Sequence, residues 1–259
     1  MGIDRVVFLG GNGHCAARLD GARRALVEHG APFDLLDVAY PGFEGRPPAT
    51  GLEAFLDVVS SRIIAAGPGP ALYATGIGGL LALCLRARGS HVDLPLLLQA
   101  PVLWGLERRL MPRVLRLLPA QRLLGRVFRT RAFQRRFARR YFARLPDAAV
   151  VEAFFEGYAR CRALADLFEW MRPALLRSLE ARFSERPDRL TGVSVWWGGR
   201  DRVVTLQELR WTETALGVRW PVRVFPDWGH YPMIDAPESW IDALASELAS
   251  LPLPLRGEG

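Results

Sequence analysis

An aspartate and a histidine in the C-terminal part of the chain could together carry out acid–base chemistry. Asp201 follows a glycine pair in the segment 197–204, and His230 lies between a glycine and Tyr231. A carboxylate that accepts a hydrogen bond from one imidazole nitrogen fixes the tautomer and leaves the other nitrogen free to take a proton. Taken singly, each has a simpler interpretation, His230 as a residue that caps a turn and Asp201 as one that starts a turn.

Residues 74–79, Ala-Thr-Gly-Ile-Gly-Gly, have the context of a nucleophile elbow but contain no serine. The preceding run, Pro70 to Ala74, is typical of a short buried strand, and residues 80–85 indicate the helix that follows. A strand that turns sharply into a helix through small residues is where the motif G-x-S-x-G places its nucleophile. Alignment of the small residues puts Gly76 at that position.

Glycine at this position affects both stability and chemistry. The elbow forces its central residue into a left-handed conformation, so Gly76 in place of serine should relieve strain of about 1 kcal/mol. It also removes the hydroxyl on which acyl-enzyme chemistry depends. Cys15 could in principle attack as a thiolate, but a small buried residue that opens a helix is the simpler interpretation. Thr75 should point away into the sheet, so we expect the usual acyl-enzyme route to be closed.

The elements that must position these residues alternate along the chain. Strand-like runs are expected at 6–9, 33–38, 70–74, 94–98, 193–197 and 222–225, and helical patterns at 16–29, 52–66, 77–88, 205–216 and 236–251. Strands separated by helices predict a mainly parallel sheet that is covered on both faces. A long helical insertion separates the fourth expected strand from the fifth.

Composition favours a soluble domain of enzyme size. The 259 residues are 50% hydrophobic, enough for one sizeable core, and no uncharged apolar run could span a bilayer. No secretory signal precedes the first strand. Cys15, Cys84 and Cys161 have neither metal-ligand spacing nor an even disulfide framework, which indicates a reducing compartment. We expect a cytoplasmic protein without a metal or organic cofactor, and leave peripheral attachment to a membrane open.

The order of these features resembles the α/β-hydrolase superfamily over nearly the whole chain. Residues 9–13, Leu-Gly-Gly-Asn-Gly, look like the family's oxyanion loop, and residues 40–46 look like its proline–glycine turn. Residues 197–204 resemble the turn that carries the acid, and residues 229–238 resemble the loop that carries the histidine. The last two segments, in this order near the C-terminus, are the most specific evidence for the resemblance. One departure is that the chain starts at the family's third strand, without its usual first hairpin.

The resemblance implies an α/β-hydrolase fold, a mainly parallel doubly wound sheet with an inserted helical cap, and it assigns roles to residues. Asp201 would orient His230 within hydrogen-bond reach, and His230 would act as general base. The backbone N–H of Ile77, with a donor from the loop at Gly11 and Asn12, would form the oxyanion hole.

Residues 103–186 occupy the place of the family's cap or lid, within a core of residues 1–102 and 187–259. Between 107 and 145 we count thirteen arginines and one acid, Glu107, in a chain of formal charge +7 without lysine. Helical projection separates aromatic residues from arginines at 131–145, and apolar residues from arginines at 111–122. The simplest interpretation is a solvated face in an arginine-biased proteome.

The charge density of the cap also favours an acidic partner: an acyl carrier protein, a coenzyme A thioester or an anionic membrane surface. Nucleic acid is not expected, because no recognised reading motif accompanies the charge. The apolar faces of the cap would enclose an apolar substrate chamber. Trp170, Met171 and Tyr231 are candidates for its wall, although core packing is the simpler interpretation of Trp170 and Met171.

Two classes of function remain. The first is a small-molecule enzyme that acts on an apolar ester, thioester or related carbonyl compound through His230, by hydrolysis, elimination or another lyase-type reaction. If Gly76 had been engineered, the parent would be a serine esterase or thioesterase. The second is a non-catalytic pseudo-hydrolase, a binding module whose basic cap docks an acidic carrier protein or an anionic membrane.

Overall fold

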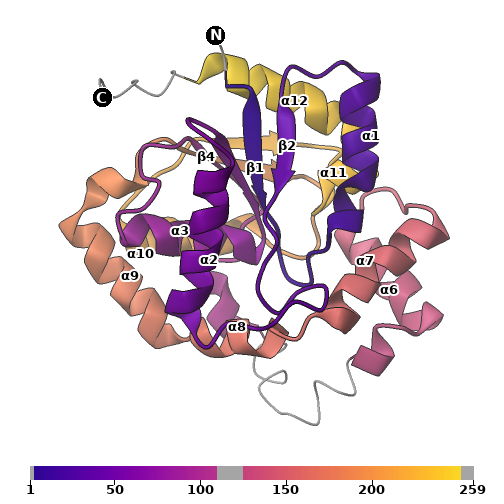
Figure 1. Cartoon of the computed structure of the whole chain (residues 1–259), viewed down its shortest axis with the longest axis horizontal. Coiled ribbons are helices and arrows are strands. Elements are labelled where there is room, and N and C mark those ends of the chain that lie inside the picture. The colour runs from indigo at the N-terminus through magenta and orange to yellow at the C-terminus, as the bar shows by residue number, and fades with distance from the viewer. Residues whose placement is uncertain (1–2, 110–124, 252–259) are drawn as a thin grey trace.

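The computed structural model describes residues 3–109 and 125–251, and a six-stranded sheet forms its centre (Figure 1). The strands are β1 (Arg5–Leu9), β2 (Asp34–Asp37), β3 (Ala71–Thr75), β4 (Leu96–Gln99), β5 (Val193–Gly198) and β6 (Val222–Phe225). They lie in the order β2-β1-β3-β4-β5-β6, and every neighbouring pair is parallel. All six predicted strands are present, and the predicted parallel α/β sheet is confirmed.

Two groups of helices cover the two faces of the sheet (Figure 1). The first group comprises α1 (Asp20–Glu28), α11 (Pro232–Asp235) and α12 (Pro237–Ser250), and the second comprises α2 (Leu52–Ala65), α3 (Ile77–Ala87), α9 (Pro173–Glu185) and α10 (Leu206–Leu216). Coverage on both faces explains why β3 and β4 are buried at every residue. Among the helices of the described residues, none combines the length and hydropathy needed to cross a membrane.

The insertion between β4 and β5 contains four described α-helices, of which only the first three stand apart from the sheet. These are α6 (Arg131–Tyr141), α7 (Ala148–Arg160) and α8 (Leu164–Trp170). The fourth, α9, packs against α3 and α10 through a buried stripe of Leu176, Leu179 and Phe183. The predicted cap of residues 103–186 therefore includes one helix of the layer that covers the sheet. The pattern expected at 111–122 and the tail from residue 252 lie outside the described residues.

Close backbone contact joins the cap to the core. A Cβ on Gly157 of α7 would lie 2.1 Å from the Gly13 carbonyl oxygen, so only glycine permits this approach. Arg18, in the 3-10 helix η1 (Ala16–Leu19), donates to the carbonyls of Asn12 at 2.9 Å and Phe154 at 2.7 Å. Its guanidinium carbon lies 3.9 Å from the centre of the Phe154 ring. The loop after β1 and the cap helix α7 are thus held as one unit.

Candidate active site

The elbow predicted at Gly76 is present between β3 and α3. Gly76 has φ 53° and ψ −122°, a conformation that favours glycine. A Cβ built there would lie 3.6 Å from the Gly11 Cα atom and 3.9 Å from the His230 Nε2 atom. These are ordinary contacts, so the position has room for a side chain that would point at His230. At the same junction a Cβ on Gly78 would lie 2.2 Å from the Leu9 carbonyl oxygen, so glycine lets α3 start close to the end of β1.

The structure brings His230 and Asp201 together. His230 Nδ1 lies 2.7 Å from the Asp201 Oδ2 atom, and the exposed fractions of the two side chains are 3% and 0%. The other carboxylate oxygen accepts the backbone N–H groups of Val203 at 2.6 Å and Val204 at 3.1 Å. Because the carboxylate only accepts, Nδ1 carries the proton and Nε2 faces Gly76 as an acceptor.

The histidine loop is anchored to the end of α6. The backbone N–H of His230 donates to the Tyr141 carbonyl at 2.7 Å, and a Cβ on Gly229 would lie 2.6 Å from the backbone nitrogen of Ala143. Asp235 accepts the N–H of Ala143, and burial raises the pKa of its carboxyl to about 6. Sequence reasoning did not identify Asp235, because nothing local distinguishes this aspartate from a solvated one.

Of the residues expected to donate to an oxyanion, Ile77 and Gly11 lie next to Gly76, and Asn12 lines the cavity described below. Ile77 is the first residue of α3, where backbone N–H groups have no partner within the helix, and it lines the same cavity. Gly11 approaches Gly76 within contact distance. Arg18 holds the carbonyl of Asn12. Arg18 is a second residue that sequence reasoning missed, since its partners Asn12 and Phe154 meet only in the folded chain.

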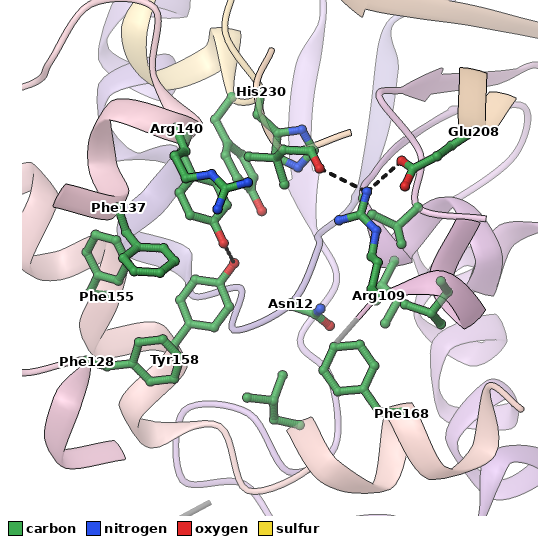
Figure 2. A pocket seen from close by; sticks show the side chains of 18 residues that line it. Asn12, Arg109, Phe128, Phe137, Arg140, Phe155, Tyr158, Phe168, Glu208 and His230 are labelled. Atoms are coloured by element: carbon green, nitrogen blue, oxygen red, sulfur yellow. Dashed lines mark hydrogen bonds and ion pairs between the residues drawn. The ribbon is translucent and has the colours of Figure 1, made fainter. Parts of the chain in front are cut away.

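A cavity of about 520 Å³ lies between core and cap, and His230, Gly76 and Tyr231 are part of its wall. Figure 2 shows aromatic side chains from the cap crowding one side of it. The aromatic residues of the cap in this wall are Phe128, Phe137, Tyr141, Phe155, Tyr158 and Phe168. This size and composition are typical of a site for a small, largely apolar molecule.

Two residues predicted for the pocket lie elsewhere. Trp170 packs edge-on against Phe55 at a ring distance of 5.9 Å, and Met171 is 2% exposed in the core. Neither side chain lines the cavity. Helical spacing identifies an apolar stripe but not the part of the protein on which it packs. Here Met171 is buried in the core and the half-buried Trp170 packs against it. Of the cavity-lining side chains that come from helices of the cap, most belong to α6 and α7 instead.

The alternative nucleophiles are also outside the cavity wall. The Cys15 thiol donates to the Ala153 carbonyl at 3.8 Å, and burial raises its pKa. Thr75 is fully buried beneath the elbow. Within residues 3–109 and 125–251, no group of three or more His, Cys, Asp or Glu side chains is arranged to hold a metal ion.

The apolar face predicted for residues 131–145 is buried in part: Ala138 and Phe142 are buried, whereas Leu145 is exposed. The predicted basic face of α6 is exposed, and its arginines are Arg131, Arg135, Arg136, Arg139 and Arg140. None of these five forms an ion pair with an acidic side chain that the structure describes. On the neighbouring helix, Glu156 pairs with Arg129 at 3.4 Å and with Arg160 at 2.7 Å.

Comparison with known proteins places this geometry in a family. The sequence profile of the alpha/beta hydrolase family matches residues 6–243. No curated protein matches the chain in sequence. Among solved structures it is similar to 2-hydroxy-6-oxo-6-phenylhexa-2,4-dienoate hydrolase from Rhodococcus sp. strain RHA1, at 19% identity and a TM-score of 0.67, covering 96% of this chain and 91% of that one.

Two further structures support the same fold. An alpha/beta hydrolase fold protein from Burkholderia ambifaria is 18% identical with a TM-score of 0.69, covering 93% of this chain and 90% of that one. A haloalkane dehalogenase from Bradyrhizobium elkani is 18% identical with a TM-score of 0.68, covering 95% and 90%. At these identities the likeness establishes the fold alone.

Proposed function

Because the chain belongs to the alpha/beta hydrolase family, we propose that it is a small-molecule enzyme that uses His230 as a general base without a serine nucleophile. The substrate would be an apolar ester, thioester or related carbonyl compound. One observation carries the proposal: the buried His230–Asp201 pair directs its free nitrogen into an apolar cavity beside Gly76.

Hydrolysis by this site would proceed through an activated water. His230 Nε2 takes a proton from a water in the space that a serine side chain would fill, and the water oxygen bonds to the substrate carbonyl carbon. The carbonyl electrons move to its oxygen, where the N–H groups of Ile77 and Asn12 stabilise the anion. The anion then collapses, the bond to the leaving oxygen or sulfur breaks, and the imidazolium returns its proton to that atom.

The second candidate is a binding module without catalysis, which the arginines of α6 favour, because none of them pairs with a described acidic side chain. Such a module would dock an acidic carrier protein, a coenzyme A thioester or an anionic membrane through this basic face. The buried His230–Asp201 pair argues for the enzyme. Burial of two polar side chains costs free energy unless their hydrogen bonds are satisfied. A protein that only binds an apolar molecule does not require such a buried pair.

Substitution of His230 separates the two candidates. We expect His230→Ala to lower kcat/KM about a hundredfold or more on a panel of apolar para-nitrophenyl esters and acyl thioesters, because general-base assistance contributes at least that much. His29→Ala removes an exposed histidine and serves as the matched control. Equal turnover by both variants would refute the proposed chemistry, and absence of turnover in the wild type on the whole panel would favour the binding module.

A further inference from the structure

Two arginines of the cavity wall contact the turn that carries Asp201. Arg109 donates to the Val203 carbonyl at 2.9 Å, and Arg140 donates to the preceding carbonyl, that of Arg202, at 3.5 Å. In Figure 2 the two arginines lie on opposite sides of the pocket, with His230 and Asn12 between them. Each guanidinium thus reaches one of two successive peptide units of one turn, next to the proposed base, and the exposed Arg140 does so at the limit of hydrogen-bond distance.

Positive charge exceeds negative charge on the described part of this wall. Its only carboxylate, Glu208, is already engaged, because its Oε2 atom accepts from Arg109 at 2.6 Å and from the Thr205 N–H at 3.2 Å. Arg140 has no ion pair with a described acidic side chain. The segment 110–124, outside the described residues, contains no Asp or Glu, and the side chain of Glu107 is likewise not described. The wall therefore has a guanidinium charge that no described carboxylate neutralises.

Both guanidinium groups have hydrogen-bond donors to spare. Within the described residues, Arg109 contacts Val203 and Glu208 through Nη2 alone, and Arg140 contacts Arg202 through Nη2 alone, which leaves Nη1 of each arginine for a ligand. The same cavity is otherwise lined mainly by apolar and aromatic side chains. The planar guanidinium of Arg109, which is largely buried in these surroundings, is suited to an oxyanion, because charge-assisted hydrogen bonds are strong where water is scarce. The exposed Arg140 adds a second positive charge at the same wall.

We propose that Arg109 and Arg140 form an anion subsite, and that the natural ligand combines an apolar body with a carboxylate or phosphate group. The aromatic wall takes the apolar body, and the two arginines take the charged end. This inference deepens the proposed function by naming the substrate class of the same cavity. It rests on that function only for the chemistry that follows binding.

Calorimetric titration with decanoate, decyl phosphate and decanol tests the subsite. We expect the wild type to bind one or both anions about tenfold more tightly than decanol, a typical effect of one charge-assisted hydrogen bond. The preferred anion identifies the headgroup. Arg140→Gln should lower the affinity for the two anions to about that for decanol, and should leave the affinity for decanol unchanged. Arg136→Gln removes the same charge one helical turn earlier, from an exposed residue outside the cavity wall, and should leave the preference intact.

Three results would overturn the subsite: equal affinity of the wild type for all three ligands, binding of none, or equal losses in Arg140→Gln and Arg136→Gln. Thermal unfolding of each variant shows whether it is folded, and we expect the Tm to stay unchanged because both arginines are exposed. The titration needs no turnover, so the proposed chemistry is tested separately. His230→Ala is expected to lower turnover about a hundredfold or more yet keep the preference for anions. A protein with His230-dependent turnover but no preference for anions would refute the subsite alone.

Discussion

At the scale of single residues, Gly76 is the position where stability and chemistry diverge. Its positive φ is free of cost for glycine and strained for any other residue. The surroundings do not require glycine, since a Cβ there would make only ordinary contacts. The elbow therefore has space for a side chain at Gly76, next to the hydrogen-bonded pair of His230 and Asp201 that we propose as the base.

We expect Gly76→Ser and Gly76→Ala to lower the free energy of unfolding equally, by about 1–3 kcal/mol, because both introduce a Cβ into the strained conformation. Urea denaturation of the two variants and the wild type measures this. A serine variant as stable as the wild type would mean that the elbow relaxes when it acquires a side chain, contrary to the rigid packing of Gly78 on β1.

The sequence predicted the proximity of residues whose neighbours in the chain form a recognisable pattern. Asp201 and His230 lie in glycine-rich turns after strands, and parallel strands bring such turns to one edge of the sheet. Arg18, Arg109 and Asp235 have no such pattern around them. Their roles depend on partners more than ninety residues away, or on the way the cap docks, neither of which periodicity encodes.

At the scale of elements, the cap is fastened to the core on both sides of the site. On one side α7 contacts the loop after β1 through Gly157 and Gly13. On the other side, the Tyr141 carbonyl at the end of α6 accepts a hydrogen bond from the backbone N–H of His230. A displacement of the cap would therefore disturb both the oxyanion loop and the proposed base.

Gly157→Ala should push α7 off the loop after β1, because the new Cβ would fall 2.1 Å from the Gly13 carbonyl oxygen. We expect a loss of about 1–3 kcal/mol in the free energy of unfolding, as for other overpacked sites, together with weaker decanol binding. Gly21→Ala is the matched control, since nothing lies within 4 Å of its Cβ position in α1. Equal behaviour of the two variants would contradict the docked cap.

Asp235 should make this junction sensitive to pH. Its pKa of about 6 in the folded protein lies above the unfolded value of 3.8, so the stabilising effect of its proton is complete below about pH 4 and is lost as pH rises through 6. A shift of about two pH units corresponds to at most about 3 kcal/mol. Urea unfolding of Asp235→Asn should lack this decline, whereas Asp227→Asn, at an exposed carboxylate, should keep it; a decline unchanged in Asp235→Asn would disprove the assignment.

Element order was predictable because each strand is a short apolar run between turn residues, and helices of 3.6-residue period separate them. Which helices belong to the cap was not. The stripe of α9 is apolar at helical spacing like those of α6 and α7, and only the fold shows that it packs on α3 and α10. The same ambiguity explains why Met171 lies in the core and Trp170 packs against it instead of lining the cavity.

At the scale of the whole molecule, the arginines give one surface of the cap a character of its own. Five exposed guanidinium groups occupy one helix, α6, in a chain of net charge +7. A field of this kind attracts anionic surfaces over about 10 Å at moderate salt.

If this face docks a membrane, the protein should float with phosphatidylglycerol vesicles at low salt and dissociate as salt rises. The triple variant Arg131→Gln, Arg135→Gln, Arg139→Gln should bind much more weakly, since each arginine near the surface contributes about 1 kcal/mol. Its turnover should match the wild type, because none of the three lines the cavity. Failure of the wild type to float at low salt would exclude a membrane partner.

The central claim is that this family member performs its chemistry from His230 while Gly76 leaves the nucleophile position empty. Rapid-quench intact mass measurement during turnover of an apolar para-nitrophenyl ester tests it most directly. The account predicts that the wild type keeps its unmodified mass while product accumulates, and that Gly76→Ser gains the mass of one acyl group. An acyl adduct on the wild-type chain during turnover would contradict it.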